Sequence, residues 1–271
     1  ECGTCDSDIT NDCESDCSDH ITCSNCTGCE ESCCPNYCSG DYYYYNRSCS
    51  NSFCVGATSD YCSNGCTEDG CIQGDNSYEN SITDIDGNTY KTIKIGDQNW
   101  MAENLKTTKY KDGTDIATGY SNWGWSNLTI GAYAVYDDNS SNADVYGNLY
   151  NWYAVDNSRG LCMEGWHVPT DAEYTVLTDF LGGSSVAGGT MKETGLEHWN
   201  SPNTGATNES GFTALPNGYR NQYGGYAGLG TGANFWSSNN GIRRDLGYNY
   251  SNVYQSSGPL NDGFPIRCLK D

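Results

Sequence analysis

The chain has 271 residues, enough for one large domain or two modest ones, and its 35 acidic and 13 basic side chains give a formal charge of −22. Nucleic acid is therefore excluded as an expected partner, because phosphate binding requires clustered lysine and arginine. No segment approaches the roughly 18 to 20 consecutive apolar residues of a membrane-spanning helix, so no membrane span is predicted.

Residues 1–75 differ sharply from the rest of the chain. They hold 15 of the 17 cysteines and 14 of the 35 acidic side chains, with Arg47 as their single basic residue. Aliphatic residues are scarce, so apolar burial cannot offset the entropy of ordering this region, and disulfide bonds are expected to stabilise it. We predict a small, loop-dominated, disulfide-rich region in an oxidising environment, extracellular or at the cell surface.

Two patterns within this region allow more than one interpretation. Cys-x2-Cys pairs such as Cys2 with Cys5 have the spacing of zinc ligands, but an exported chain favours disulfides. The run Tyr42–Tyr45 has strand propensity and either fills a small core or forms an exposed edge or contact patch.

A polar linker is predicted over residues 76–81, followed by a second domain over residues 82–271. Residues 82–100 alternate apolar and polar side chains around Asp86-Gly87, which indicates a β-hairpin. Asp84, Asp86 and Asn88 resemble part of a calcium loop. The required glycine and glutamate are missing, however, so calcium is not supported by a motif.

Farther along the chain, residues 148–155 favour a short helix. A stronger helix signal covers residues 171–181, where Thr170 and Glu173 form a capping box and Gly182-Gly183 ends the pattern. Short aromatic strands are expected at residues 233–237 and 248–254. Together these elements predict an α+β fold rich in loops.

From about residue 82 to residue 271 the sequence resembles the Fibrobacter succinogenes major paralogous domain family, exported bacterial domains of Fibrobacter and the Bacteroidetes. The resemblance covers 190 of the 271 residues. The blocks that carry it are TDIDGNTYKTIKIGDQNWMAENLKTTKYKDGT (83–114), GNLYNWYAV (147–155), LCMEGWHVPTDAEYTVLTDFLGG (161–183), ATNESGFTALPNGYRN (206–221), FWSS (235–238) and GFPIRCLKD (263–271).

This family is similar to the C-type-lectin and formylglycine-generating-enzyme superfold. The resemblance implies a mixed domain whose termini lie close together and a disulfide between Cys162 and Cys268. These two cysteines are the only ones after residue 71, which agrees with that pairing. No general activity accompanies the family.

Catalytic signals are weak, and we predict that the protein is not an enzyme. None of His20, His167 and His198 falls in a metal-binding pair, and His167 is expected to order the turn before the helix. Sugar-binding C-type lectins hold calcium through an E-P-N or Q-P-D triplet and a W-N-D strand. This sequence offers only Ser201-Pro202-Asn203 and Trp236-Ser237-Ser238 in their place. No catalytic residue, metal site or cofactor is therefore predicted.

Two kinds of glycan contact are expected. Aromatic rings that combine an apolar face with a polar edge suit sugar stacking, although they also serve as core residues. The candidate stacking residues are Tyr120, Trp123, Trp125, Tyr219 and Tyr223. Candidate glycosylation sites are the sequons at Asn25, Asn46, Asn127, Asn139, Asn208 and Asn249.

Cysteine parity suggests self-association. If Cys162 pairs with Cys268, 15 cysteines remain, and an odd number cannot pair internally. One of them is then expected to be free, bonded to another chain, or paired with a residue before Glu1. We interpret the chain as a non-enzymatic structural or adhesive surface protein, the repeating subunit of an extracellular fibre. The alternative is a lectin-like glycan-binding module.

Overall fold

The computed structural model describes residues 81–271 throughout and, before them, the backbone of Asn80 and of seven short strands between residues 37 and 71. Contacts between residues divide the chain into two units, Glu1–Asp75 and Asn76–Asp271. No helix in the described part is long and apolar enough to cross a membrane.

Short antiparallel strands are the described elements of the first unit. The tyrosine run forms β2 (Tyr42–Tyr45), the central strand between β1 (Tyr37–Ser39) and β5 (Thr58–Tyr61), as its strand propensity predicts. The remaining strands form two pairs, β3 (Ser48–Ser50) with β4 (Phe53–Val55) and β6 (Cys66–Thr67) with β7 (Gly70–Cys71). The disulfide pairing expected among the cysteines of residues 1–75 lies outside the described residues.

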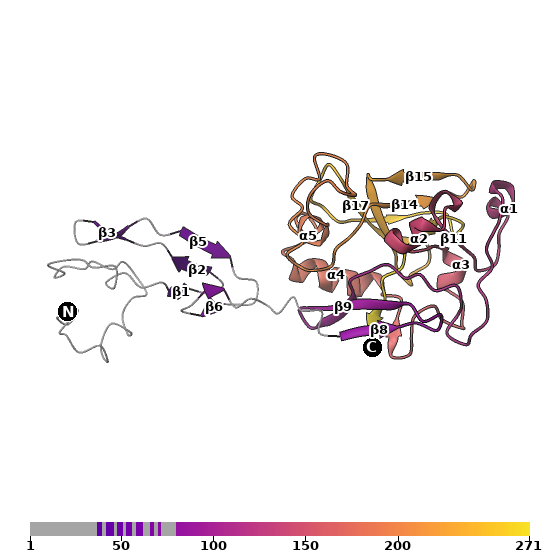
Figure 1. Cartoon of the computed structure of the whole chain (residues 1–271), viewed down its shortest axis with the longest axis horizontal. Coiled ribbons are helices and arrows are strands. Elements are labelled where there is room, and N and C mark those ends of the chain that lie inside the picture. Colours follow the sequence, from indigo (N-terminus) through magenta and orange to yellow (C-terminus); the bar gives the residue numbers. More distant parts are fainter. Residues whose placement is uncertain are drawn as a thin grey trace. The chain divides into compact units, whose positions relative to one another are not determined.

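The second unit begins and ends in one five-stranded antiparallel sheet. Its order is β13-β20-β10-β9-β8, so the first and last strands of the unit belong to the same sheet (Figure 1). The strands are β8 (Asn80–Thr83), β9 (Thr89–Ile95), β10 (Gln98–Met101), β13 (Trp166–His167) and β20 (Leu269–Lys270).

Two further antiparallel sheets complete the strand framework. The larger has the order β11-β12-β19-β14-β15 and the smaller the order β16-β17-β18. Their strands are β11 (Tyr133–Ala134), β12 (Leu149–Asn151), β14 (Asn217–Arg220), β15 (Tyr226–Leu229), β16 (Gly232–Trp236), β17 (Ile242–Gly247), β18 (Tyr254–Ser257) and β19 (Gly263–Phe264). With the helices, they make the second unit an α+β domain.

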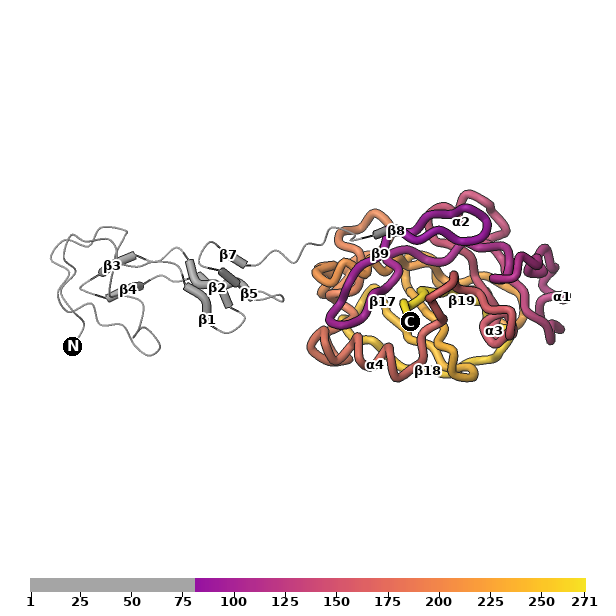
Figure 2. The backbone as a smooth tube through the Cα atoms, turned by 90° about the horizontal axis from the view of Figure 1, so that it is seen from below, coloured from indigo at the N-terminus to yellow at the C-terminus, as the bar shows by residue number. Residues whose placement is uncertain are grey.

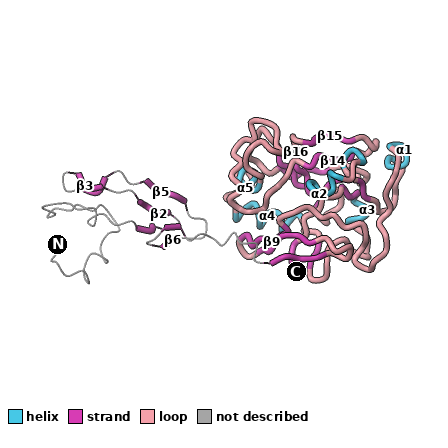
Figure 3. Tube along the Cα trace, in the orientation of Figure 1, coloured by secondary structure: helices cyan, strands magenta, loops and turns pink. Residues whose placement is uncertain are grey.

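Helices are short, and loops make up most of the second unit (Figure 3). The helices are α1 (Asn122–Ser126), the 3-10 turn η2 (Tyr136–Asp138), α2 (Ser141–Tyr146), α3 (Trp152–Val155), α4 (Asp171–Phe180) and α5 (Ala187–Met191).

The predicted helix and hairpin are both present. The Thr170 hydroxyl accepts from the Glu173 backbone N–H at 3.2 Å, and the Glu173 carboxylate accepts from the Thr170 N–H at 2.7 Å, so the capping box begins α4 as expected. Thr83 pairs with Thr89 across the Asp86-Gly87 turn. There, Asp84 Oδ1 accepts from the N–H groups of Asp86 and Asn88. The Asp84 carboxylate, which resembled a calcium ligand in the sequence, therefore stabilises the turn.

Two local predictions are wrong. Residues 148–155 are helical only from Trp152 onward, because Leu149–Asn151 pair with β11 and β19. Residues 248–254 form a connecting segment, since β17 ends at Gly247 and β18 begins at Tyr254. At residues 149–151 pairing with distant strands overrides the local pattern, whereas residues 248–253 pair with no described strand.

Aromatic residues dominate the core. Trp100, Trp125, Trp199 and Trp236 are fully buried. In one core cluster, Tyr174 and Leu177 of α4 pack against Trp100 of β10, and α4 also contacts β17 (Figure 2). Helix α4 thereby packs its apolar face against the sheet that contains β10.

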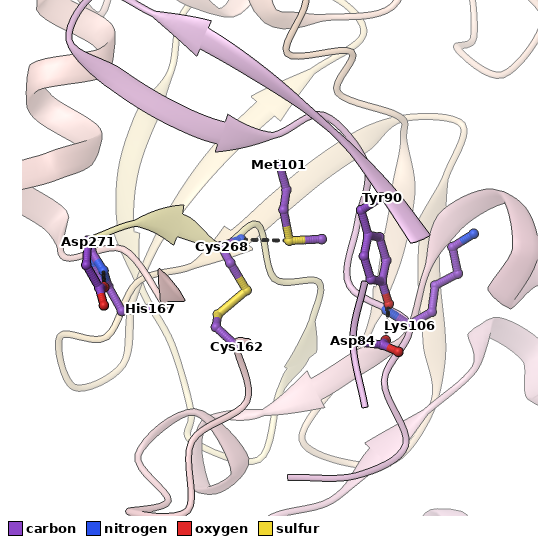
Figure 4. Close-up of a disulfide and its surroundings, with 8 residues drawn as sticks. All are labelled: Asp84, Tyr90, Met101, Lys106, Cys162, His167, Cys268 and Asp271. Atoms are coloured by element: carbon purple, nitrogen blue, oxygen red, sulfur yellow. Dashed lines mark hydrogen bonds and ion pairs between the residues drawn. A yellow bond between two sulfur atoms is a disulfide. The ribbon is translucent and has the colours of Figure 1, made fainter. Parts of the chain in front are cut away.

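A disulfide between Cys162 and Cys268 lies in the second large core cluster (Figure 4). Its S–S distance is 2.05 Å, and both residues are buried. The Cys268 N–H donates to the Met101 sulfur at 3.4 Å. The bond ties the loop before β13 to the end of the chain, in the pairing that the family resemblance implies.

Candidate functional site

An open pocket of about 570 Å³ lies where three segments of the second unit meet. One is the loop after β10, another precedes β11, and the third is α3 with the turn that follows it. The lining residues are Tyr110, Asp115, Ala117, Thr129, Ile130, Gly131, Tyr153, Asp156, Asn157, Ser158 and Arg159. Its size falls within the roughly 300–1,000 Å³ of pockets that hold small ligands.

Asn151 fixes two walls of this pocket. Its side-chain oxygen accepts from the Ala154 N–H at 3.1 Å, which caps α3, and from the Ala132 N–H at 2.9 Å. Its amide nitrogen donates to the Ile130 carbonyl at 2.9 Å. Because Asn151 is completely buried, these bonds hold residues 130–132 against α3 in a fixed arrangement.

Gly131 lets the Tyr110 side chain enter the pocket wall. A Cβ atom at Gly131 would lie 2.0 Å from the Tyr110 hydroxyl oxygen and 2.8 Å from the Ala154 Cα. Any other residue would push Tyr110 away or displace α3. The close approach of the two segments thus requires glycine at this position.

Arg159, which also lines the pocket, lies over the Tyr110 ring. Its guanidinium carbon is 4.0 Å from the ring centre, its Nε donates to Asn157 at 3.0 Å and its Nη1 donates to Thr114 at 2.9 Å. The cation–π contact and the two hydrogen bonds orient the guanidinium. Its remaining N–H groups can meet a bound molecule.

The Tyr110 hydroxyl is the unusual polar group of the wall. Only 1 % of Tyr110 is exposed, and its hydroxyl has no hydrogen-bond partner among the described residues. Burial raises the pKa of this hydroxyl, while the Arg159 guanidinium acts in the opposite direction. The group therefore stays protonated near neutral pH, able both to donate and to accept.

The predicted stacking residues separate into exposed and buried rings. Trp123 is 79 % exposed and Tyr223 is 73 % exposed. They lie on segments in contact, because a Cβ atom at Gly224 would fall 2.3 Å from the Asn122 Cα. Tyr120 is half-buried in a small core cluster with Trp125.

Trp125 and Tyr219 correct the stacking prediction. Trp125 is fully buried, its indole N–H donates to the Asn261 carbonyl at 2.6 Å, and the Arg220 guanidinium covers its ring at 4.5 Å. Tyr219 is half-buried with its ring 5.7 Å from that of Phe264. Trp125 is thus a core residue, and Tyr219 packs against the core.

The sequons also differ in accessibility. Asn127, Asn139 and Asn249 are exposed. Asn208 is half-buried, and its amide nitrogen donates to the Thr213 hydroxyl at 3.0 Å. Asn25 and Asn46 lie outside the described residues.

Both histidines of the second unit contact carboxylates. His167 Nδ1 is 2.6 Å from Asp271, and its Nε2 is 3.0 Å from Glu173, the capping residue of α4. Burial alone lowers the pKa of His167, but the bonds to Asp271 and Glu173 outweigh it and raise the pKa above its ordinary value.

The second histidine belongs to a group with potential metal ligands. Glu193, Glu197 and His198 place their ligand atoms within 4.8 Å of one another. His198 Nδ1 lies 2.9 Å from the Glu193 carboxylate, so a hydrogen bond already accounts for the contact between these two residues.

These features define an α+β domain of short antiparallel sheets, closed by one disulfide and carrying an open pocket with polar and aromatic walls. The model of the Fibrobacter succinogenes major domain family matches residues 93–270, and the chain belongs to this family. The matched residues include the whole pocket. No curated protein and no solved structure matches the chain.

Sequence reasoning missed the pocket residues. Tyr110 and Tyr153 lie within family blocks, but no local pattern separates them from core tyrosines. Asp156–Arg159 follow a short helix as an ordinary polar turn. The signal that distinguishes them, their meeting around one cavity, arises only when the three segments pack together.

Proposed function

We propose that this chain is a non-enzymatic, exported surface protein with a structural or adhesive role, and that it forms the repeating subunit of an extracellular fibre. The observation that carries the proposal is the Cys162–Cys268 disulfide. It occupies both cysteines of the second unit and leaves an odd number, 15, in residues 1–75. One of these cysteines is then available to another chain.

Several properties support this proposal. A high cysteine content suits an extracellular, oxidising location. His167 and His198 are engaged with carboxylates in structural contacts, which favours a role without catalysis or cofactor. Contacts that join unlike surfaces head to tail propagate into a filament when their rotation does not close a ring.

Microscopy and light scattering of the native protein test the fibre. We expect filaments in negative stain and, on non-reducing gels, covalent oligomers that become a 29.5 kDa chain after reduction. A monodisperse monomer at high concentration would overturn the proposal. Mass spectrometry of the same reduced sample tests glycosylation, since an unmodified mass would exclude it.

We further propose that the second unit is a divergent member of the C-type-lectin-like superfold. Its first and last strands share a sheet, and a disulfide secures its carboxy-terminal end. An experimental structure that superposes on no lectin-like domain would overturn this assignment.

Glycan binding is the second candidate function. It is favoured by the exposure of Trp123 and Tyr223 on adjoining segments, because such rings offer an apolar face for stacking. A glycan array is expected to give a signal with the native protein. The absence of any signal would overturn this candidate while leaving the fibre proposal, which is tested by microscopy.

A further inference from the structure

We propose that the pocket lined by Tyr110, Tyr153 and Arg159 binds one neutral saccharide residue, the terminal or exposed unit of a glycan. This inference rests on the second candidate function, glycan binding, and moves its site away from the exposed aromatic pair. Neither residue of that pair lines the pocket. The pocket offers polar and apolar side chains from three segments, whereas an exposed ring offers one face.

The charges around the pocket favour a neutral ligand. Asp115 and Asp156 repel an anion, while Arg159 weakens their attraction for a cation. A polyhydroxylated molecule suits this mixture, because its hydroxyl groups donate to carboxylates and accept from the guanidinium. Asn157 and Ser158 add further polar groups at the rim.

The apolar part of the lining suits the body of a sugar ring. Tyr153 is half-buried, and Ile130 is 54 % exposed although it is aliphatic. With Ala117 they form apolar surface beside the carboxylates and guanidinium. A pyranose ring has C–H groups on its faces and hydroxyls on its edge, so it can use both kinds of surface at once.

The pocket is also preorganised. Asn151 holds residues 130–132 against α3, and Gly131 admits the Tyr110 side chain between them. Because these contacts exist without a ligand, little ordering has to accompany binding. We expect the affinity for a single sugar unit to be weak and to depend on the side chains at the rim.

Saturation-transfer NMR with the full chain tests the inference. The probes are glucose, galactose, mannose and cellobiose, with glucuronate and glucosamine as charged counterparts. We expect transfer to at least one neutral sugar and markedly weaker transfer to both charged sugars. Binding of glucuronate or glucosamine in preference to all the neutral sugars would overturn the proposed ligand class.

Variants locate the bound sugar. Asp156→Asn and Tyr153→Ala are expected to weaken binding at least tenfold, whereas Trp123→Ala leaves it unchanged. Asp179→Asn, which neutralises an exposed carboxylate on α4, is the matched control for charge. Near-ultraviolet circular dichroism checks that each variant retains its native packing.

The outcomes separate the two proposals. Binding lost in Trp123→Ala but retained in Asp156→Asn and Tyr153→Ala would overturn the pocket and keep glycan binding. The absence of binding to every sugar and to a glycan array would overturn both.

Discussion

The guanidinium of Arg159 covers the Tyr110 ring, with 4.0 Å between the guanidinium carbon and the ring centre. The hydroxyl end of Tyr110 lies against Gly131 so closely that no Cβ atom fits between them. The ring therefore joins two pocket walls. Its hydroxyl, in contrast, contributes no hydrogen bond within the described residues.

This contrast predicts different effects for two tyrosine-to-phenylalanine substitutions. Tyr110→Phe is expected to leave the free energy of unfolding unchanged or to raise it by up to about 1 kcal/mol, because an unsatisfied buried group is removed. Tyr150→Phe is expected to lower it by about 1–2 kcal/mol, since that hydroxyl donates to the Thr107 carbonyl at 2.7 Å. Chemical denaturation under non-reducing conditions measures both. Equal losses of unfolding free energy in the two variants would contradict the conclusion that the Tyr110 hydroxyl makes no stabilising hydrogen bond.

The two tryptophans of α1 are expected to respond oppositely to truncation. Trp125→Ala removes a buried ring and a hydrogen bond, so it should lower the free energy of unfolding by about 3–5 kcal/mol. Trp123→Ala changes an exposed side chain and should shift it by about 0.5 kcal/mol or less. Thermal unfolding of both variants compares them directly. A stable Trp125→Ala variant would contradict the burial of this ring.

The contacts of His167 predict a pH-dependent contribution to stability. Because the pKa of His167 is raised in the folded chain, its contribution is complete below the unfolded pKa, near 6.5, and is lost as the pH rises through the folded value. Burial by itself raises the pKa of Glu173, but the hydrogen bonds to Thr170 and His167 outweigh it, so the pKa of this carboxyl is lowered. The contribution of the Glu173 carboxylate to stability is therefore lost in acid.

Denaturation of the native chain and His167→Gln from pH 5 to 9 measures this effect. The free energy of unfolding of the native chain is expected to exceed that of the variant most at the acid end of this range, and by progressively less above neutral pH. A difference that stays constant with pH would show that His167 does not change its proton affinity on folding.

The buried Lys192 predicts that stability rises with pH in alkaline solution, opposite to the effect of His167. Its ammonium is buried and donates to the carbonyls of Thr204, Gly247 and Tyr250, each at 2.9 Å. Burial lowers the pKa of Lys192 to about 8 from 10.5. Between these values the unfolded chain retains a proton that the folded chain has released, so stability rises with pH.

Lys192→Met is the comparison for this prediction. From about pH 8 to 10.5 the native chain should gain up to about 3 kcal/mol in unfolding free energy relative to the variant, at about 1.4 kcal/mol per pKa unit. Taking the difference between the two proteins cancels the contribution of the tyrosines, which titrate in the same range. A difference in unfolding free energy that does not change with pH would show that folding does not lower the pKa of Lys192.

Local signals predicted the elements whose stabilising contacts are themselves local. The capping box of α4 joins Thr170 to Glu173, and the Asp86-Gly87 turn is held by Asp84, two residues before Asp86. The segment at residues 148–155 failed because strand partners at Tyr133–Ala134 and Gly263–Phe264 compete with helix formation. No window of neighbouring residues contains that information.

Composition and motif order were sufficient for the family, the α+β class and the pairing of Cys162 with Cys268, since these depend on residue types in a fixed succession. Tertiary packing alone decided which aromatic rings face solvent and which charged side chains are buried. Arg220 and Lys192 lie inside because distant carbonyl oxygens converge on them. The pocket likewise exists only where three separate loops meet, because its polar groups become a site through proximity in space.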